Sequence, residues 1–76
     1  MEFEKLRDIL VETLSCDPEQ VTPETNLADD LGADSLDSME LMMALEEATG
    51  LTIEDEDAVN LKTVSDILAY LNAHIQ

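Results

Sequence analysis

One serine stands where a loop gives way to a helical pattern, and of all the residues it has the clearest chemical potential. It is Ser35, at the centre of residues 32–38, which read Gly-Ala-Asp-Ser-Leu-Asp-Ser. A serine at such a position commonly caps the helix through its hydroxyl. Here Asp34 and Asp37 offer carboxylates for the same task. We therefore expect the hydroxyl of Ser35 to be dispensable for capping and open to other chemistry.

A hydroxyl of this kind either attacks a substrate or is itself modified. A nucleophilic serine needs an adjacent base and an oxyanion site. The only histidine, His74, is far along the sequence, no lysine stands near Ser35, and the neighbouring aspartates are poor bases toward an alcohol. We therefore predict no catalytic residues and interpret Ser35 as the target of another enzyme. A phosphodiester there would lie at a helix N-terminus, where free N–H groups and the helix dipole favour an anion.

The composition predicts a single all-α domain over residues 1–76. Hydrophobic residues make up 45% of the chain, yet Phe3 and Tyr70 are the only aromatic ones. Leu, Ile, Val, Met and Ala must supply the packing, and this mixture favours helices. Cys16 is the single cysteine, which excludes an internal disulfide bond.

The charge restricts the possible partners. Nineteen acidic residues stand against three basic ones, giving a formal net charge of −16. Such a chain repels nucleic acids and anionic membranes and is attracted to basic protein surfaces. We expect a cytoplasmic monomer that binds no nucleic acid and does not insert into a membrane.

Apolar spacing predicts three longer helices and one short one. The first spans residues 2–15, the second begins at Asp34 or Ser35 and runs to about Thr49, and the last begins at the capping box of residues 63–66. Residues 58–61, after the acidic run 54–57, form a brief third helix at best. Residues 16–33 read as a long ordered loop. The expected fold is a small antiparallel four-helix bundle.

The helix that begins beside Ser35 carries two apolar strips. The core face is broad and comprises Leu41, Met42, Ala44, Leu45 and Ala48. The second strip comprises Leu36, Met39 and Met43, bordered by Glu40, Glu46 and Glu47. Either the bundle buries this helix on two sides, or the second strip is a docking surface. Methionines give adaptable apolar contacts, and the carboxylates suit a basic partner.

The acidic runs do not form a specific metal site. A calcium loop needs acidic residues at alternate positions and a glycine at the sixth. Counting back from Gly32 or Gly50 places Leu27 or Leu45 at the first position, so the pattern fails. We expect only weak, non-specific cation binding, at residues 29–30 and 54–57.

Residues 29–47 resemble the attachment region of acyl carrier proteins of the bacterial, dissociated type, and the resemblance extends over the whole chain. It implies a four-helix bundle in which Ser35, flanked by Asp34 and Leu36, receives 4'-phosphopantetheine. A phosphopantetheinyl transferase would supply this group from coenzyme A. The resemblance also implies a non-catalytic carrier that holds growing acyl chains as thioesters on the prosthetic thiol.

The resemblance further implies a partner surface for acyl-chain synthases and transferases that have basic docking surfaces. The residues concerned are Leu36, Asp37, Met39, Glu40, Met43, Glu46 and Glu47. Fatty acid biosynthesis is the expected pathway. A carrier for polyketides or another specialised acyl pathway, and an unmodified acidic adaptor, remain the alternatives.

Overall fold

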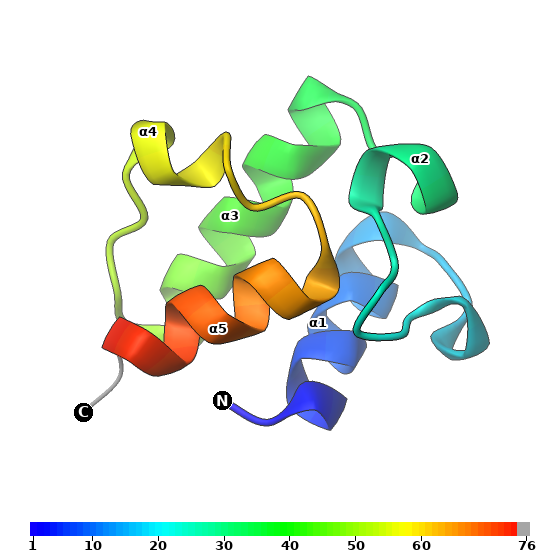
Figure 1. The fold of residues 1–76 in the computed structure, drawn as a ribbon, viewed down its shortest axis with the longest axis horizontal. Helices are drawn as coiled ribbons and strands as arrows, with labels where there is room; N and C mark the ends of the chain where they lie inside the picture. Colours follow the sequence, from blue (N-terminus) through cyan, green and yellow to red (C-terminus); the bar gives the residue numbers. More distant parts are fainter. Residues whose placement is uncertain (75–76) are drawn as a thin grey trace.

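The computed structural model describes residues 1–74, and it confirms the all-helical fold. Within these residues no strand forms, and the one β-bridge joins Asn26 to Thr63. None of the described helices combines the length and the apolar character needed to cross a bilayer. In chain order the elements are α1 (Phe3–Leu14), the 3-10 turn η1 (Pro18–Gln20), α2 (Leu27–Leu31), α3 (Ser35–Thr49), α4 (Asp55–Ala58) and α5 (Val64–His74), as Figure 1 shows.

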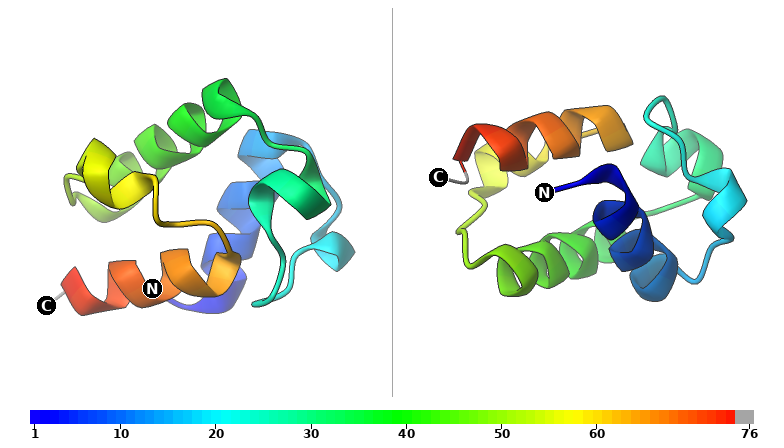
Figure 2. Two further views of the ribbon diagram at one scale, coloured as in Figure 1. Left: turned by 45° about the horizontal axis from the view of Figure 1, so that its top comes forward. Right: turned by 90° about the horizontal axis from the view of Figure 1, so that it is seen from below.

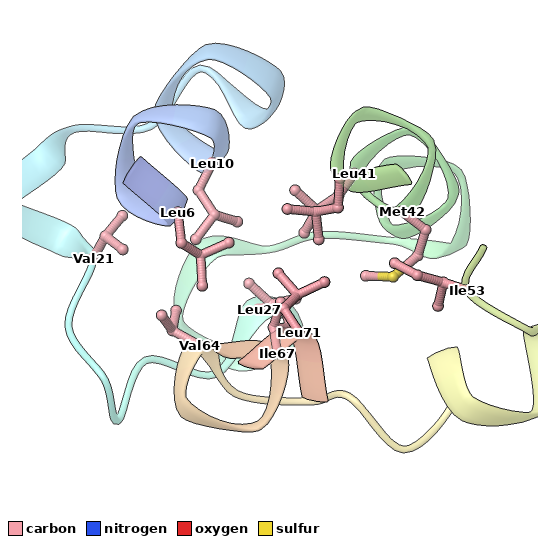
Figure 3. Close-up of a cluster of buried hydrophobic side chains, with 11 residues drawn as sticks. Leu6, Leu10, Val21, Leu27, Leu41, Met42, Ile53, Val64, Ile67 and Leu71 are labelled. Atoms are coloured by element: carbon pink, nitrogen blue, oxygen red, sulfur yellow. The ribbon is translucent and has the colours of Figure 1, made fainter. Parts of the chain in front are cut away.

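The three long helices supply most of the core. In Figure 3 their side chains point toward one another, with Leu6 and Leu10 from α1 facing Leu41 from α3 and Ile67 from α5. Burial of a side chain of this size stabilises a fold by about 1.5–3 kcal/mol. The buried hydrophobic residues are Leu6, Leu10, Val21, Leu27, Leu41, Met42, Leu45, Ile53, Val64, Ile67 and Leu71.

The long connection from α1 to α3 is held by hydrogen bonds of its own. Thr25 is buried, and its hydroxyl donates to the carbonyl of Gln20 at 2.8 Å and accepts from the backbone N–H of Thr22 at 2.8 Å. The connection also contains α2, a helix absent from the sequence prediction. Asn26 caps it by accepting from the N–H groups of Ala28 and Asp29, both at 3.0 Å. The predicted ordered loop therefore contains a capped helical turn beside the start of α3.

The short helix α4 begins earlier than predicted. The acidic residues 55–57 lie within it, although the sequence analysis placed the helix after them. Carboxylates in a first helical turn are favoured by the helix dipole. A tertiary contact holds the helix as well: the hydroxyl of Tyr70 in α5 donates to Oδ2 of Asp57 at 3.0 Å. The Tyr70 ring in turn stacks on the ring of His74, with centroids 4.2 Å apart.

We predict that Tyr70→Phe destabilises the protein near neutral pH and has a smaller effect in alkali. Partial burial, followed by the hydrogen bond to Asp57, raises the pKa of Tyr70 above its ordinary value of 10.0. Because the folded-state pKa exceeds the unfolded one, the stabilisation is complete below pH 10.0 and is lost as the pH rises through the folded-state pKa. Urea unfolding of both proteins across this range should show converging stabilities. A constant difference would contradict the assignment.

Candidate functional site

Ser35 is the first residue of α3, and the two neighbouring aspartates cap the helix in its place. The N–H of Asp37 donates to Oδ1 of Asp34 at 2.9 Å, and the N–H of Asp34 donates to Oδ2 of Asp37 at 3.4 Å. Ser35 is exposed, and within residues 1–74 its hydroxyl makes no hydrogen bond. The structure thus bears out the expectation that capping does not occupy this hydroxyl.

A left-handed turn brings the chain from α2 into α3. Gly32 ends α2 with φ 68°, and the N–H of Ala33 donates to the carbonyl of Leu27 at 2.9 Å. Glycine adopts this conformation without the steric cost that a Cβ brings. The turn leads directly into α3, whose first residue, Ser35, is exposed. Figures 1 and 2 show the start of α3 at the edge of the bundle, joined to α2 by a short connection.

An open groove of about 940 Å³ begins at Ser35. Its walls come from α2, from one side of α3, from α4 and from the segment that leads to α5. The buried side chains in its lining are Leu27 from α2, Met42 from α3 and Ile53 from the loop before α4, and Ala58 and Leu61 are half-buried. The complete lining is Asn26, Leu27, Ala28, Asp29, Ala33, Asp34, Ser35, Ser38, Met39, Met42, Met43, Glu46, Ile53, Asp55, Ala58, Val59, Leu61 and Lys62.

These residues fit a phosphate-linked arm on Ser35. The hydroxyl is free to form a phosphodiester, and it lies at a helix N-terminus, which favours an anion. Asp34 and Asp37 repel the same anion, since each is an acidic residue within two positions of Ser35. The groove offers apolar surface next to the attachment point. The arrangement can therefore hold a tethered group that moves between the groove and solvent.

The second apolar strip of α3 is exposed, which favours docking over burial on two sides. Leu36 is 62% exposed, and Met39 and Met43 are each 61% exposed. Val59 in the turn after α4 is 69% exposed and lines the groove together with both methionines. The sequence analysis missed Val59. The helix predicted at residues 58–61 was too short for its apolar spacing to show which side chains face solvent.

The acidic residues expected beside the strip have different roles. Glu40 and Glu47 are exposed and free to meet a partner. Asp37 is half-buried in the capping box, and Glu46 is half-buried because its Oε2 accepts from the N–H of Ile53 at 2.7 Å. The structure therefore leaves Glu40 and Glu47 as the available carboxylates of the strip and gives Asp37 and Glu46 internal bonds.

The opposite face of α3 packs into the core, with one exception. Leu41, Met42 and Leu45 are buried and Ala44 is half-buried, as expected. Ala48, predicted for the same face, is exposed. It lies in the last turn of α3, beyond Leu45, the last residue of the helix that is buried. The core covers less of this helix than the apolar pattern suggested.

Comparison with known proteins matches residues 4–71 to the family described as phosphopantetheine attachment site. The chain is 56% identical over 70 residues to an acyl carrier protein of Thermosynechococcus vestitus, covering 92% of this chain and 86% of that protein. It is 57% identical over 67 residues to an acyl carrier protein of Bdellovibrio bacteriovorus, covering 88% and 86%.

The fold leads to the same class. A solved structure assigned as an acyl carrier protein of Mycobacterium tuberculosis superposes with a TM-score of 0.86 at 32% identity, covering 93% of this chain and 95% of that one. A helical carrier domain with a phosphopantetheine attachment site is therefore the class that fold and sequence define. The chain belongs to the acyl carrier protein family.

We predict that Asp34→Ala destabilises the protein and that Ser35→Ala does not. Loss of an N-cap acceptor costs about 0.5–2 kcal/mol, whereas an exposed side chain without a hydrogen bond contributes within about 0.5 kcal/mol. Urea unfolding followed by circular dichroism measures both. Asp34→Asn is the matched control, because its amide oxygen still accepts from the N–H of Asp37. If Ser35→Ala were as costly as Asp34→Ala, the hydroxyl would not be free.

Proposed function

We propose that Ser35 is the residue that carries phosphopantetheine and that this acyl carrier protein serves fatty acid biosynthesis. The observation that carries the proposal is the exposed, unbonded hydroxyl of Ser35 at the head of α3. The matched family, described as a phosphopantetheine attachment site, supports it. When bound, the group supplies a terminal thiol that holds the acyl chain as a thioester.

Different residues around Ser35 would attract, repel and shelter parts of this arm. The first backbone N–H groups of α3 favour the phosphate, while Asp34 and Asp37 repel it and direct the arm outward. The apolar walls of the groove, among them Met42, Ile53 and Leu61, would shelter part of an acyl chain. Each buried methylene group contributes about 0.8 kcal/mol, so a few carbons suffice to retain the chain without trapping it.

The surroundings of Ser35 support modification of its hydroxyl by another enzyme. Within residues 1–74 no basic side chain lies at hydrogen-bonding distance from the Ser35 hydroxyl, so activation of that hydroxyl must come from outside. A phosphopantetheinyl transferase that takes the group from coenzyme A is the partner this implies. Acyl-chain synthases and transferases would then meet the loaded carrier at the exposed strip of α3.

Incubation with coenzyme A and a broad-specificity phosphopantetheinyl transferase tests the attachment site. One phosphopantetheine should be added to the wild type, detected by mass spectrometry of the intact protein, and none to Ser35→Ala. Since Ser38 also lines the groove, Ser38→Ala is the control and should be modified normally. An unmodified wild type, or a modified Ser35→Ala, would contradict the proposal.

The pathway needs a separate measurement. Mass spectrometry of the acyl groups on protein purified from its own cells distinguishes a carrier for fatty acids from a carrier for polyketides.

We predict that the carboxylates of the strip guide partners to Ser35. The double substitution Glu40→Lys and Glu47→Lys should slow the transferase reaction at low substrate at least tenfold, because two attractive contacts become repulsive. Glu4→Lys with Glu12→Lys is the control, since it makes the same charge change at exposed positions of α1. Rates within about twofold of each other for the two double variants would show that only net charge matters.

A further inference from the structure

Among the described residues that line the groove beside Ser35, Lys62 is the only one with a positively charged side chain. It is also the only lysine or arginine after Arg7 in a chain of nineteen acidic residues. The acidic residues that line the same groove are Asp29, Asp34, Glu46 and Asp55. A single cation in such surroundings is expected to pair with a carboxylate. Within residues 1–74, however, Lys62 forms no ion pair.

The backbone of Lys62 is fixed although its side chain is exposed. Its carbonyl accepts from the N–H of Leu27 at 3.0 Å, and its N–H donates to Oδ2 of Asp66 at 3.4 Å. The first bond holds the segment between α4 and α5 against the start of α2, and the second ties it to α5; this segment lines the groove together with α2 and α3. A lysine carries its ammonium on a flexible four-carbon stem. Lys62 thus has a backbone held by hydrogen bonds and an ammonium group that is unpaired within residues 1–74, at the wall of the groove.

The attached arm is the partner that this cation lacks. A phosphodiester on Ser35 adds a negative charge within two positions of Asp34 and Asp37, and the N-terminus of α3 offsets only about half a charge. The rest of the arm carries amide carbonyls, which also accept hydrogen bonds from an ammonium group. No other side chain lining the groove offers a compensating charge.

We propose that Lys62 binds the oxygen acceptors of the phosphopantetheine arm, at its phosphate or its amide carbonyls, and draws the arm into the groove. This inference rests on the proposed attachment at Ser35. Asp34 and Asp37 repel the phosphate of the arm, whereas Lys62 attracts the arm. The balance of these charges sets the fraction of molecules in which the arm lies inside the groove. Lys62 acts here as a binding residue for the arm and takes no part in chemistry.

The experiment compares the modified forms of wild type, Lys62→Met, Lys62→Arg and Lys5→Met. All carry Cys16→Ser, because Cys16 is the only cysteine and its removal leaves the arm with the sole thiol. Lys5 is exposed on α1 and does not line the groove, so Lys5→Met controls for the change in net charge. Mass spectrometry first establishes that each protein carries one arm.

The first readout is nuclear magnetic resonance of the arm. In Lys62→Met we expect the phosphorus resonance to shift if the lysine binds the phosphate, and the arm amide resonances to shift if it binds the carbonyls.

The second readout is the alkylation rate of the arm thiol. An exposed charged contact is weak, so Lys62→Met should react about two- to fivefold faster than wild type at low salt, with the difference lost near 1 M salt. Lys62→Arg and Lys5→Met should match wild type.

Each outcome decides between defined alternatives. Unshifted arm resonances in Lys62→Met, or an alkylation rate equal to that of Lys5→Met, would overturn the role of Lys62. Either result would leave attachment at Ser35 intact, because the arm had been added. A wild type that accepts no arm at all would overturn the attachment and this inference together.

Discussion

The reciprocal hydrogen bonds between Asp34 and Asp37 are the interaction on which the site depends. A helix start has N–H groups that need acceptors, and the N-cap residue, here Asp34, normally provides one. Because the two aspartates exchange these bonds, Ser35 can begin α3 without contributing to its stability. The same carboxylates place negative charge beside the hydroxyl. The same two side chains therefore support the start of α3 and set the charge around the proposed attachment residue.

A small core has to hold together a strongly self-repelling chain. The net charge of −16 favours expansion, and burial of hydrophobic residues, eleven of them among residues 1–74, opposes it. Polar contacts add to this packing in the segments outside the three long helices, such as the Tyr70–Asp57 bond at α4 and the Thr25 bonds in the long connection. The strip of α3 remains uncovered in this arrangement. The fold thus uses one face of α3 for its core and leaves the other exposed to solvent.

Apolar spacing made α1, α3 and α5 predictable, although α3 carries apolar residues on two sides, and the caps marked where helices begin. Thr63 and Asp66 form the predicted box, with the N–H of Asp66 donating to Oγ1 of Thr63 at 3.1 Å and the N–H of Thr63 to Oδ2 of Asp66 at 3.2 Å. The availability of Ser35 followed from its acidic neighbours. The sequence was therefore sufficient for features that depend only on neighbouring residues of one segment, such as a helix and its cap.

The features that sequence reasoning missed require several segments at once. The helix α2 has only five residues, too few for a visible period, and the N–H of Leu27 at its start bonds to the distant carbonyl of Lys62. The groove draws its walls from four parts of the chain, so no single pattern reveals it. The exposure of Val59 was missed for the same reason, because it depends on how the turn after α4 lies against the rest of the fold.

The bond from Glu46 to the backbone of Ile53 has a consequence for anyone mapping contacts by mutation. Glu46 sits among the carboxylates of α3, yet its oxygen anchors the loop that leads to α4 and the far wall of the groove. Replacing it would release this loop as well as remove a carboxylate from the surface of α3. A substitution scan along this helix therefore cannot count Glu46 as an interface residue on loss of binding alone, because the same carboxylate also holds the loop.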